Sequence, residues 1–487
     1  MSFPTSIAEN IRAEAEKLIE MVSGEGSQCP TAHEIEDQLW RELLAMGQQL
    51  MQLFFTTCEK QEARQKVYEV EGIAYGYAGQ KKRQYVSLFG EVAVWRACYW
   101  SKGLGSHFPL DERLSLPPRS FSDLVQARVS ELTVYMPYGD ATELFARWLG
   151  WTLPKRSSEQ MNADHVDYVA AYYAAHVVPA PPTSDTILVV SADGKGIPMT
   201  RQDSPPLEAR RGRGEKKTAK KDATVTALYT IAPYQRCSDD IIQALVPGDA
   251  AENSSGISRP TPTNKQVFGT LAGQKVAFEH MARQVEQRRA AHIVHYVALT
   301  DGNRGLKNRV QHDLPQFTLI VDLIHVTEYL WEAATTLLGE THPLRDLWMR
   351  DALRCLLEDE LDRLLNHLNY QLAGLPKRKQ TTLKKVLNYL GTNRDYMHYH
   401  DYLAQGYPIG TGVIEGACRH LVKDRFERAG MRWSKVGAQV MLDLRAVYLN
   451  GDWDDFQRFR RHQVHQQRYG SVHSDLVPEE LMLGVAA

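Results

Sequence analysis

The sequence predicts a mixed α/β core that follows a helical region and a β-hairpin. Two apolar runs rich in Val, Ile and Leu, Thr186 to Val190 and Ile293 to Leu299, each lead into an Asp-Gly pair. From residue 184 onward, strand patterns come first and then alternate with helical patterns, which is typical of a mixed sheet covered by helices. With 487 residues, 43% of them hydrophobic, the chain is long enough for two to four domains.

The regions before the core are expected to be helical, then β, then helical again. Residues 1–75 form the first helical region, because their apolar positions recur mostly every three or four residues: Leu39, Leu43, Leu44, Met46, Leu50, Leu53 and Phe54. Residues 76–119 alternate apolar and polar positions either side of Gly90, which predicts a hairpin of Tyr85–Phe89 and Val92–Tyr99. Residues 120–180 predict three helices of a helix-turn-helix-like, DNA-binding region, although helical hairpins occur in many other folds. Prolines cluster near residue 180, where we place a domain boundary.

The first part of the core is expected over residues 181–338. Its strands are predicted at 186–192, 223–231, 240–246, 293–299 and 318–321, and its main helices at 264–289 and 326–338. This is the element order of an RNase H-like fold. Residues 339–406 are charged and helical, and they exceed a single connection, so they predict a helical insertion. Residues 407–450 then supply the final helix of the core, and 451–487 form a C-terminal tail.

Three acidic residues lie where such a fold can use them. Asp193 and Asp301 follow the two apolar runs, so each lies at the carboxyl end of a strand, where open α/β sheets place their sites. Glu415 lies in a stretch with helical periodicity. Together they can hold two divalent cations, Mg²⁺ or Mn²⁺, through hard oxygen ligands. The alternative is that each Asp-Gly is an ordinary turn.

Two groups of basic residues accompany these acids. The predicted loop after the Asp193 strand carries seven within twelve positions: Arg210, Arg211, Arg213, Lys216, Lys217, Lys220 and Lys221. A second group follows Glu415: Arg419, Lys423, Arg425, Arg428 and Arg432. Both groups would contact DNA phosphates without reading the base sequence. A solvated loop and a solvated helix face are the alternatives.

Asp322 and His325 form a D-x-x-H pattern at the end of a predicted strand. Asp322 could be a fourth metal ligand, or the pair could be structural.

No CxxC occurs among the six cysteines, which argues against a cysteine zinc site and fits a reducing cytoplasm. The sequence holds no phosphate-loop or nucleophile-elbow motif. No apolar run approaches the ~20 residues that span a bilayer, and the polar N-terminus is not a secretory signal. A formal charge of −2 neither supports nor excludes nucleic acid.

Taken together, these motifs resemble those of bacterial insertion-sequence transposases of the ISKra type, in the DDE group near the Mutator-like enzymes. The resemblance runs from about Arg83 to Tyr448 and rests on six sequence stretches, namely YVSLFGEVAVWRACYW, HFPLDERL, SADGKGIPM, TDGNRGLKNRV, DLIH and GVIEGACRHLVKDRFERAGMRWS. Relatives often carry paired cysteines after the first hairpin. Only Cys98 stands there in this chain, which argues against a zinc ribbon.

The resemblance implies an RNase H-like core with Asp193, Asp301 and Glu415 as the catalytic triad, supported by Asp322 and His325. It implies an enzyme that binds transposon ends and target as double-stranded DNA, then cleaves and joins strands with two Mg²⁺ ions. A homo-oligomer on DNA, located in the bacterial cytoplasm at the nucleoid, is expected. A catalytically inactive DNA-binding regulator and a simple metal-dependent nuclease remain the alternatives.

Overall fold

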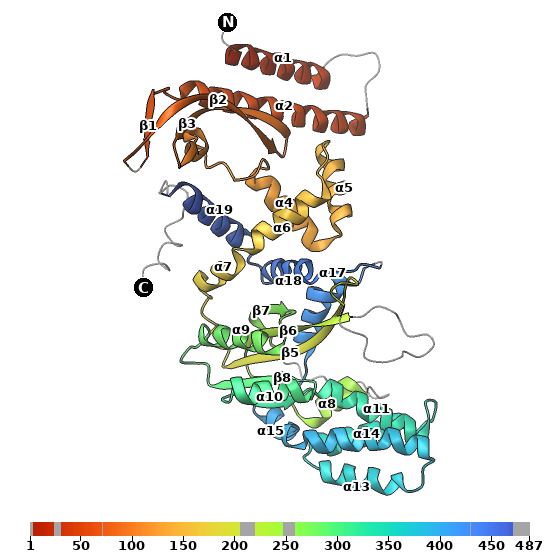
Figure 1. Cartoon of the computed structure of the whole chain (residues 1–487). Helices are drawn as coiled ribbons and strands as arrows, with labels where there is room; N and C mark the ends of the chain where they lie inside the picture. The colour runs from red at the N-terminus through yellow and green to blue at the C-terminus, as the bar shows by residue number, and fades with distance from the viewer. Residues whose placement is uncertain are drawn as a thin grey trace. The chain divides into compact units, whose positions relative to one another are not determined.

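The computed structural model describes residues 3–23, 31–70, 72–204, 220–246, 259–428 and 430–470. The chain divides into two compact units (Figure 1): the first combines Met1–Ala175 with Trp453–Ala487, and the second is His176–Asp452. The chain therefore leaves the first unit once and returns to it. Among the described helices, none combines the length and the apolar character needed to cross a membrane.

The first unit begins with two helices and a four-stranded antiparallel sheet. Its elements are α1 (Phe3–Ser23), α2 (Ala32–Gln61), β1 (Val67–Val70), β2 (Ile73–Ser87), β3 (Gly90–Ser101) and β4 (Gly105–His107). Thr31 and Glu34 form a capping box that starts α2. The expected hairpin about Gly90 is present and longer than predicted. The helical region predicted over residues 1–75 ends at Gln61, and β1 and the start of β2 take the place of its last part.

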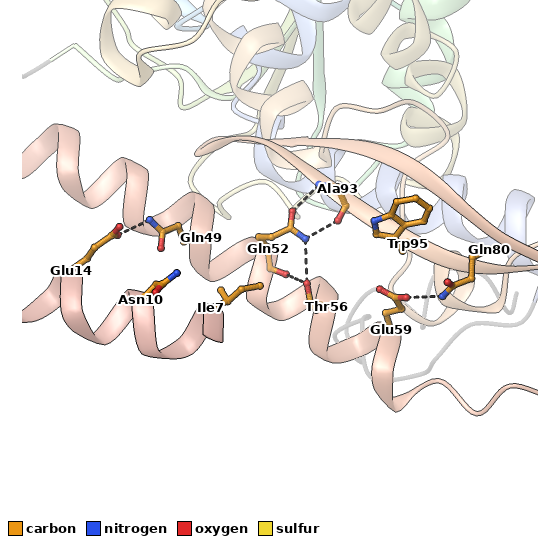
Figure 2. Close-up of a pocket in the computed structure, with 10 residues that line it drawn as sticks. All are labelled: Ile7, Asn10, Glu14, Gln49, Gln52, Thr56, Glu59, Gln80, Ala93 and Trp95. Carbon is orange, nitrogen blue, oxygen red and sulfur yellow. Dashed lines mark hydrogen bonds between the residues drawn. The ribbon is translucent and has the colours of Figure 1, made fainter. Parts of the chain in front are cut away.

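Helix α2 closes the outer edge of β3 with glutamine side chains. Gln52 donates to the Ala93 carbonyl at 2.9 Å and accepts from the Ala93 amide at 2.9 Å, and Gln48 donates to the Glu91 carbonyl. Gln48 and Gln52 are four residues apart, a rise of ~6 Å along the helix, and Glu91 and Ala93 are two residues apart, a rise of ~6.8 Å along the strand. The two spacings match closely enough for each glutamine to reach its own backbone partner. Beside these contacts α1, α2 and the sheet line a groove of about 740 Å³ (Figure 2).

Five helices complete the first unit before residue 175. They are α3 (Pro109–Arg113), α4 (Asp123–Tyr135), α5 (Tyr138–Leu149), α6 (Lys155–Val166) and α7 (Val169–Ala175). Residues 120–175 therefore hold four helices, not three, and α4 packs against both α5 and α6. The helix α19 (Trp453–Tyr469) joins them, because the buried Arg460 pairs with Asp123 at 2.8 Å. Residues expected as a C-terminal tail thus supply part of this unit.

The second unit is built on a five-stranded mixed sheet, so the predicted mixed α/β class is confirmed. Its strands are β5 (Ile187–Pro198), β6 (Lys220–Ile231), β7 (Thr263–Thr270), β8 (His295–Thr300) and β9 (Thr318–Val321). The strand order is β7-β6-β5-β8-β9. β6 runs antiparallel to β5 and β7, whereas β8 runs parallel to β5 and β9.

The third strand of this sheet was predicted in the wrong place. Residues 240–246 form most of a helix, α8 (Ser238–Leu245), which Cys237 and Asp240 start with a capping box. The strand is β7, which we had assigned to the helix over 264–289; that helix, α9 (Gln274–Glu286), begins only after Gly273. A Cβ on Gly269 of β7 would lie 2.8 Å from Leu421, so a glycine lets the next layer approach the sheet.

Helices cover both faces of the sheet. Alternate residues of β5 enter two different cores, as the two-residue period of a strand requires. Leu188 and Val190 pack with α9 and α10 (Arg304–Asp313), whereas Ile187 and Val189 pack with α11 (Leu323–Leu338). The sheet therefore has one hydrophobic core on each of its two faces.

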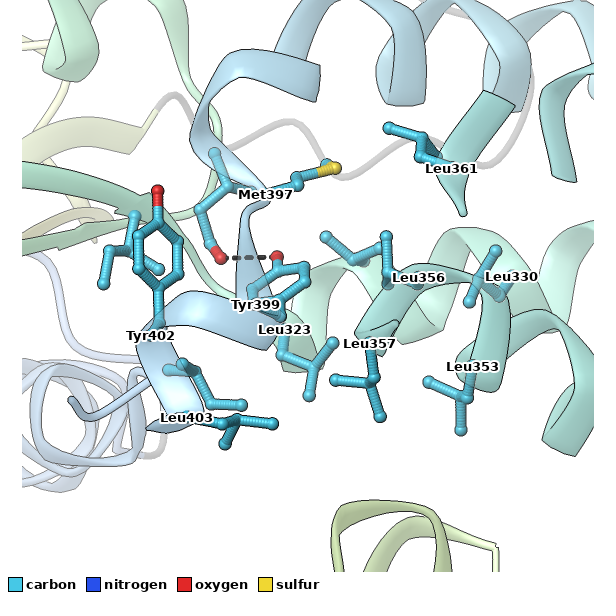
Figure 3. Close-up of a cluster of buried hydrophobic side chains, with 14 of the residues drawn as sticks. Leu323, Leu330, Leu353, Leu356, Leu357, Leu361, Met397, Tyr399, Tyr402 and Leu403 are labelled. Atoms are coloured by element: carbon cyan, nitrogen blue, oxygen red, sulfur yellow. Dashed lines mark hydrogen bonds between the residues drawn. The ribbon is translucent and has the colours of Figure 1, made fainter. Parts of the chain in front are cut away.

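All of residues 339–406 are described by the structure, and their regular secondary structure is entirely helical. These are α12 (Arg345–Leu357), α13 (Leu361–Leu372), α14 (Lys377–Asn393), a 3₁₀ turn (Arg394–Tyr396) and α15 (Tyr399–Ala404). Leu353, Leu356 and Leu357 of α12 and Tyr399 and Leu403 of α15 join the same core as α11 (Figure 3). The segment is therefore part of the second unit's main core.

The chain then returns to the sheet through α16 (Gly412–Ala417), a π-helical turn (Cys418–Lys423), α17 (Asp424–Phe426) and α18 (Lys435–Leu449). The residues of α18 contact β7, and those of α16 contact β5 and β6. This return brings Glu415 to the strand that carries Asp193.

Candidate acidic site

Three aspartates lie just beyond the last paired residues of adjacent parallel strands. Ser191 pairs with Leu299, and Thr300 pairs with Val321. Continuing each register by one or two residues places Asp193 beside Asp301, and Asp301 beside Asp322. Neighbouring strands lie ~4.8 Å apart, and residues directly opposite each other project to the same face. The sheet register therefore brings the acids predicted at 193 and 301 to one edge, although 108 residues separate them.

The helix that carries Glu415 is anchored to Asp193 through Cys418. The Cys418 thiol lies 3.4 Å from Asp193 Oδ2 and donates to it. Glu415 and Cys418 are three residues apart, so they project from one face of the helix. Burial, and next the negative charge of Asp193, raise the pKa of the Cys418 thiol, which therefore keeps its proton at neutral pH. The sequence pattern alone gave Cys418 no role at this site.

Glu415 is tied on its other side to Asp322. Thr411 donates from its hydroxyl to Asp322 Oδ2 at 2.6 Å, and its hydroxyl also lies 3.2 Å from Glu415 Oε1. Asp193 and Asp301 are partly buried and Glu415 is exposed. Asp301 and Asp322 follow the last residues of β8 and β9, whereas Asp193 lies within β5, two residues beyond its last pair with β8. The expectation that Asp193 ends its strand is therefore wrong, because β5 continues to Pro198 through its pairing with β6.

Asp322 is fully buried, and hydrogen bonds occupy both of its oxygens. Its carboxylate accepts from the amides of Ile324, His325 and Thr411 at 3.0, 3.3 and 3.1 Å, and it caps α11. It also accepts from the Thr411 hydroxyl and meets His325 Nδ1 at 2.6 Å. Burial acts to raise the pKa of Asp322, but the hydrogen bonds from His325, Thr411 and Ile324 outweigh it and lower the pKa.

His325 is protonated at neutral pH. Its hydrogen bond to Asp322 raises its pKa to about 9 against the opposing effect of burial, and the charges of Asp322, Glu328 and Asp301 add to the rise. Asp322, His325 and Glu415 place ligand atoms within 4.8 Å of one another, a spacing that could hold a metal ion. A metal there would have to displace the proton from His325 and break the hydrogen bonds of Asp322. The geometry therefore favours a structural part for this pair.

The turn that carries Asp301 is braced by α14. Tyr389 donates to the Asp301 carbonyl at 2.9 Å, and its ring stacks on Tyr329 with centroids 3.7 Å apart. Gly302 follows at φ +85°, and a Cβ there would lie 3.1 Å from Tyr389 and Asn393. The Asn303 amide donates to Asp301 Oδ1 at 2.8 Å. A residue with a side chain at 302 would be strained and would push α14 from the turn.

A buried arginine supports the π-helical turn beyond Glu415. The Arg445 guanidinium donates to the Leu421 carbonyl at 2.9 Å and to the His420 carbonyl. A π turn widens the helix and is often found at functional sites. Here it begins at Cys418, which contacts Asp193, and it carries the basic side chains of Arg419 and Lys423.

The predicted basic residues differ in their exposure and in their partners. Lys220 is exposed and pairs with Glu427 at 2.5 Å, and Lys221 is partly buried. Exposed side chains include Lys423 and Arg432, together with Arg419, which lies 3.9 Å from Asp424. Five others lie outside the described residues: Arg210, Arg211, Arg213, Lys216 and Lys217.

Arg425 does not fit the predicted basic surface. Its side chain is fully buried, its guanidinium lies 4.8 Å from the centre of the Trp433 ring, and it contacts Met431 Sδ. Trp433 in turn pairs with Met199 as a short extension of the sheet beyond β5. Arg425 therefore packs this extension and has no surface to offer a phosphate.

No protein-family model and no curated protein sequence matches the chain. Among solved structures it is similar to the Drosophila P element transposase strand transfer complex, at 10% sequence identity and a TM-score of 0.25. The match covers 72% of this chain and 82% of that chain. Because both the identity and the TM-score are low, this similarity by itself establishes neither the fold nor an activity of the chain.

Proposed function

We propose that the chain is a DNA transposase of the DDE group, in which Asp193, Asp301 and Glu415 form the catalytic triad. The observation that carries this proposal is that the elements bearing the three acids lie together. The register of β5 and β8 brings the two aspartates near each other, and the Cys418 contact holds the Glu415 helix against Asp193. Three carboxylates on adjacent elements suit the cleavage and joining of phosphodiester bonds.

The strand arrangement supports an RNase H-like core. Numbered along the second unit, the strands lie in the order 3-2-1-4-5, and the second strand alone runs against both its neighbours. The first and fourth strands are parallel; Asp301 follows the end of the fourth, and Asp193 lies two residues beyond the last pair between them. The order of elements along the chain is the one expected from the sequence once β7 replaces the strand predicted at 240–246 and α8 is added.

The three carboxylates fit a pair of divalent cations. All are hard oxygen donors and none of the three residues is fully buried, as suits a site for Mg²⁺ or Mn²⁺. Asp193 would contribute to both ions, with Asp301 and Glu415 each holding one. When bound, the two ions would supply an activated water or 3′-hydroxyl and stabilise the leaving oxygen. Asp322 and His325 would position Glu415 through Thr411 without binding metal.

The exposed basic residues would hold the DNA backbone beside this site. Lys423, Arg419 and Arg432 follow Glu415, and Lys220 and Lys221 lie on the strand paired with β5. The loop residues from Arg210 to Lys217 belong to the same proposal.

The helices α4 to α7 are proposed to read the transposon ends. The family resemblance suggests an ISKra-type element, a homo-oligomer on DNA and a bacterial, nucleoid-associated location.

The test compares Asp193→Asn, Asp301→Asn and Glu415→Gln with the wild type on duplex DNA carrying the element's own ends. Each change keeps the side-chain size and removes one negative charge. We expect all three to lose strand cleavage and transfer in Mg²⁺ while binding the DNA about as tightly as the wild type. Full strand transfer by Asp193→Asn would remove Asp193 from the triad and refute the proposal.

Supplying a 3′-hydroxyl donor end separates the alternatives. Joined products from the wild type support a transposase, cut products alone indicate a nuclease, and DNA binding without products indicates a regulator. Inverted repeats flanking the gene would further support an insertion sequence.

A further inference from the structure

The first half of α14 carries a concentrated positive charge that the proposed function does not yet use. Its sequence KRKQTTLKKVLNYLGTN contains no acidic residue. Lys377, Arg378, Lys379 and Lys384 are all exposed, and we call them the α14 cationic patch. Among the described residues, none of the four forms an ion pair. The neighbouring Lys385, by contrast, pairs with Glu332 at 3.0 Å.

The patch is placed where it costs stability. Three of its cations occupy the first turn of α14, at the positive end of the helix dipole, where each is unfavourable. The N-cap is Pro376, and no side chain caps the first turn. By comparison, Lys275 of α9 and Arg289 just after α9 each have a glutamate partner. Uncompensated charge of this kind is expected where a polyanion binds.

The other end of α14 is fixed to the acidic site. Tyr389 donates to the Asp301 carbonyl, and Asn393 accepts from Lys307 of α10. The helix is buried along Leu383, Val386 and Leu390. Whatever binds the patch is therefore held at a set distance from Asp301.

We propose that the α14 cationic patch binds the phosphate backbone of duplex DNA and fixes that DNA relative to Asp301. The inference rests on the proposed function, because it takes the DNA at the acidic site as the ligand. Lys379 and Lys377 lie ten and twelve residues before Tyr389, which is ~15–18 Å along the helix. A duplex running along α14 rises 3.4 Å per base pair, so the contacted phosphates would lie about five base pairs from the site of cleavage.

The experiment measures binding of the full chain to duplex DNA over a range of salt concentrations. The test variant is Lys377→Ala/Arg378→Ala/Lys379→Ala. The control, Lys275→Ala/Arg283→Ala/Arg289→Ala, removes the same number of exposed cations from α9 and the turn that follows it; α9 packs on the other face of the sheet. We expect the slope of log K against log [salt] to flatten by up to ~2.7 in the test variant and little in the control.

A second measurement locates the contact. Duplexes are shortened stepwise on each side of the cleavage site, and the test variant and wild type are compared on each. The difference between them should vanish once one flank is shorter than about five base pairs. Without DNA the test variant should unfold at the same temperature as the wild type or slightly higher, because unfavourable charges have been removed.

An unchanged salt slope in the test variant, or equal flattening in both variants, would overturn this inference and leave the proposed function standing. Flattening with single-stranded RNA but not with duplex DNA would also overturn it. Failure of the wild type to bind DNA at all would overturn both.

Discussion

At the scale of single residues, Thr411 links the buried Asp322 to the exposed Glu415. Thr411→Val keeps the side-chain shape but removes both hydroxyl contacts, so one Asp322 oxygen loses a donor in a buried setting. We expect a loss of about 1–3 kcal/mol in the free energy of unfolding and weaker strand transfer. Thr411→Ser retains the hydroxyl and should recover most of both. Equal defects in the two variants would show that the methyl group matters instead.

Asp443 gives the second unit a pH-dependent stability. It lies in α18, and burial raises its pKa to about 7 although Gln439 donates to it at 2.9 Å. The folded chain therefore holds a proton that the unfolded chain releases between pH 4 and pH 7. The free energy of unfolding is therefore highest below pH 4. It falls by up to ~4 kcal/mol as the pH rises from 4 to 7, and it stays at the lower value above pH 7.

Asp443→Asn removes that titration. We expect the variant to unfold at a higher temperature than the wild type at pH 8, with a difference that shrinks towards pH 4. Thermal unfolding at pH 4.5, 6 and 8 measures this. Asp351→Asn, an exposed acid on α12, is the control and should show no such trend. A difference independent of pH would mean that Asp443 stays ionised in the fold.

At the scale of elements, α14 controls the position of Asp301. Tyr389→Phe keeps the stacking on Tyr329 and removes only the hydrogen bond to the Asp301 carbonyl. A loss of ~1.4 kcal/mol would lower the rate of strand cleavage about tenfold, with DNA affinity unchanged. Tyr370→Phe on α13, where the side chain is 82% exposed, is the control. Equal rates for both variants would remove Tyr389 from the positioning of the site.

Elements with strong local patterns were predictable from the sequence, and others were not. The strand at Thr318–Val321 is found at its predicted bounds, because four apolar or β-branched residues lie between clear breaks. β7 was missed because its apolar residues also fit a helix, and only packing under Leu421 and Leu442 explains Gly269. The register between β5 and β8, and the contact of Thr411 with Asp322 across 89 residues, are properties of the folded chain. The sequence could name the acids but not the contacts that hold them.

At the scale of the whole molecule, the first unit is completed by a helix from the far end of the chain. Tyr172 of α7 packs edge-on against Phe456 and Phe459 of α19, and Arg460 pairs with Asp123. We expect a fragment of residues 3–175 to unfold without a sharp transition, and expect the same fragment joined to residues 453–470 by a flexible linker to unfold cooperatively. Circular dichroism during heating measures this. A sharp transition in the shorter fragment would make α19 dispensable.

The glutamines of α2 bear on how the protein behaves when concentrated. An open strand edge offers its amides and carbonyls to any other extended chain, and such edges seed aggregation. Gln52 occupies both backbone groups of Ala93, and Gln48 occupies the carbonyl of Glu91. The two side chains thus take the place of a neighbouring strand. Unlike a strand, they present no new backbone edge with which another molecule could pair. Solubility of this chain depends in part on two neutral amides, which charge-based measures of solubility would overlook.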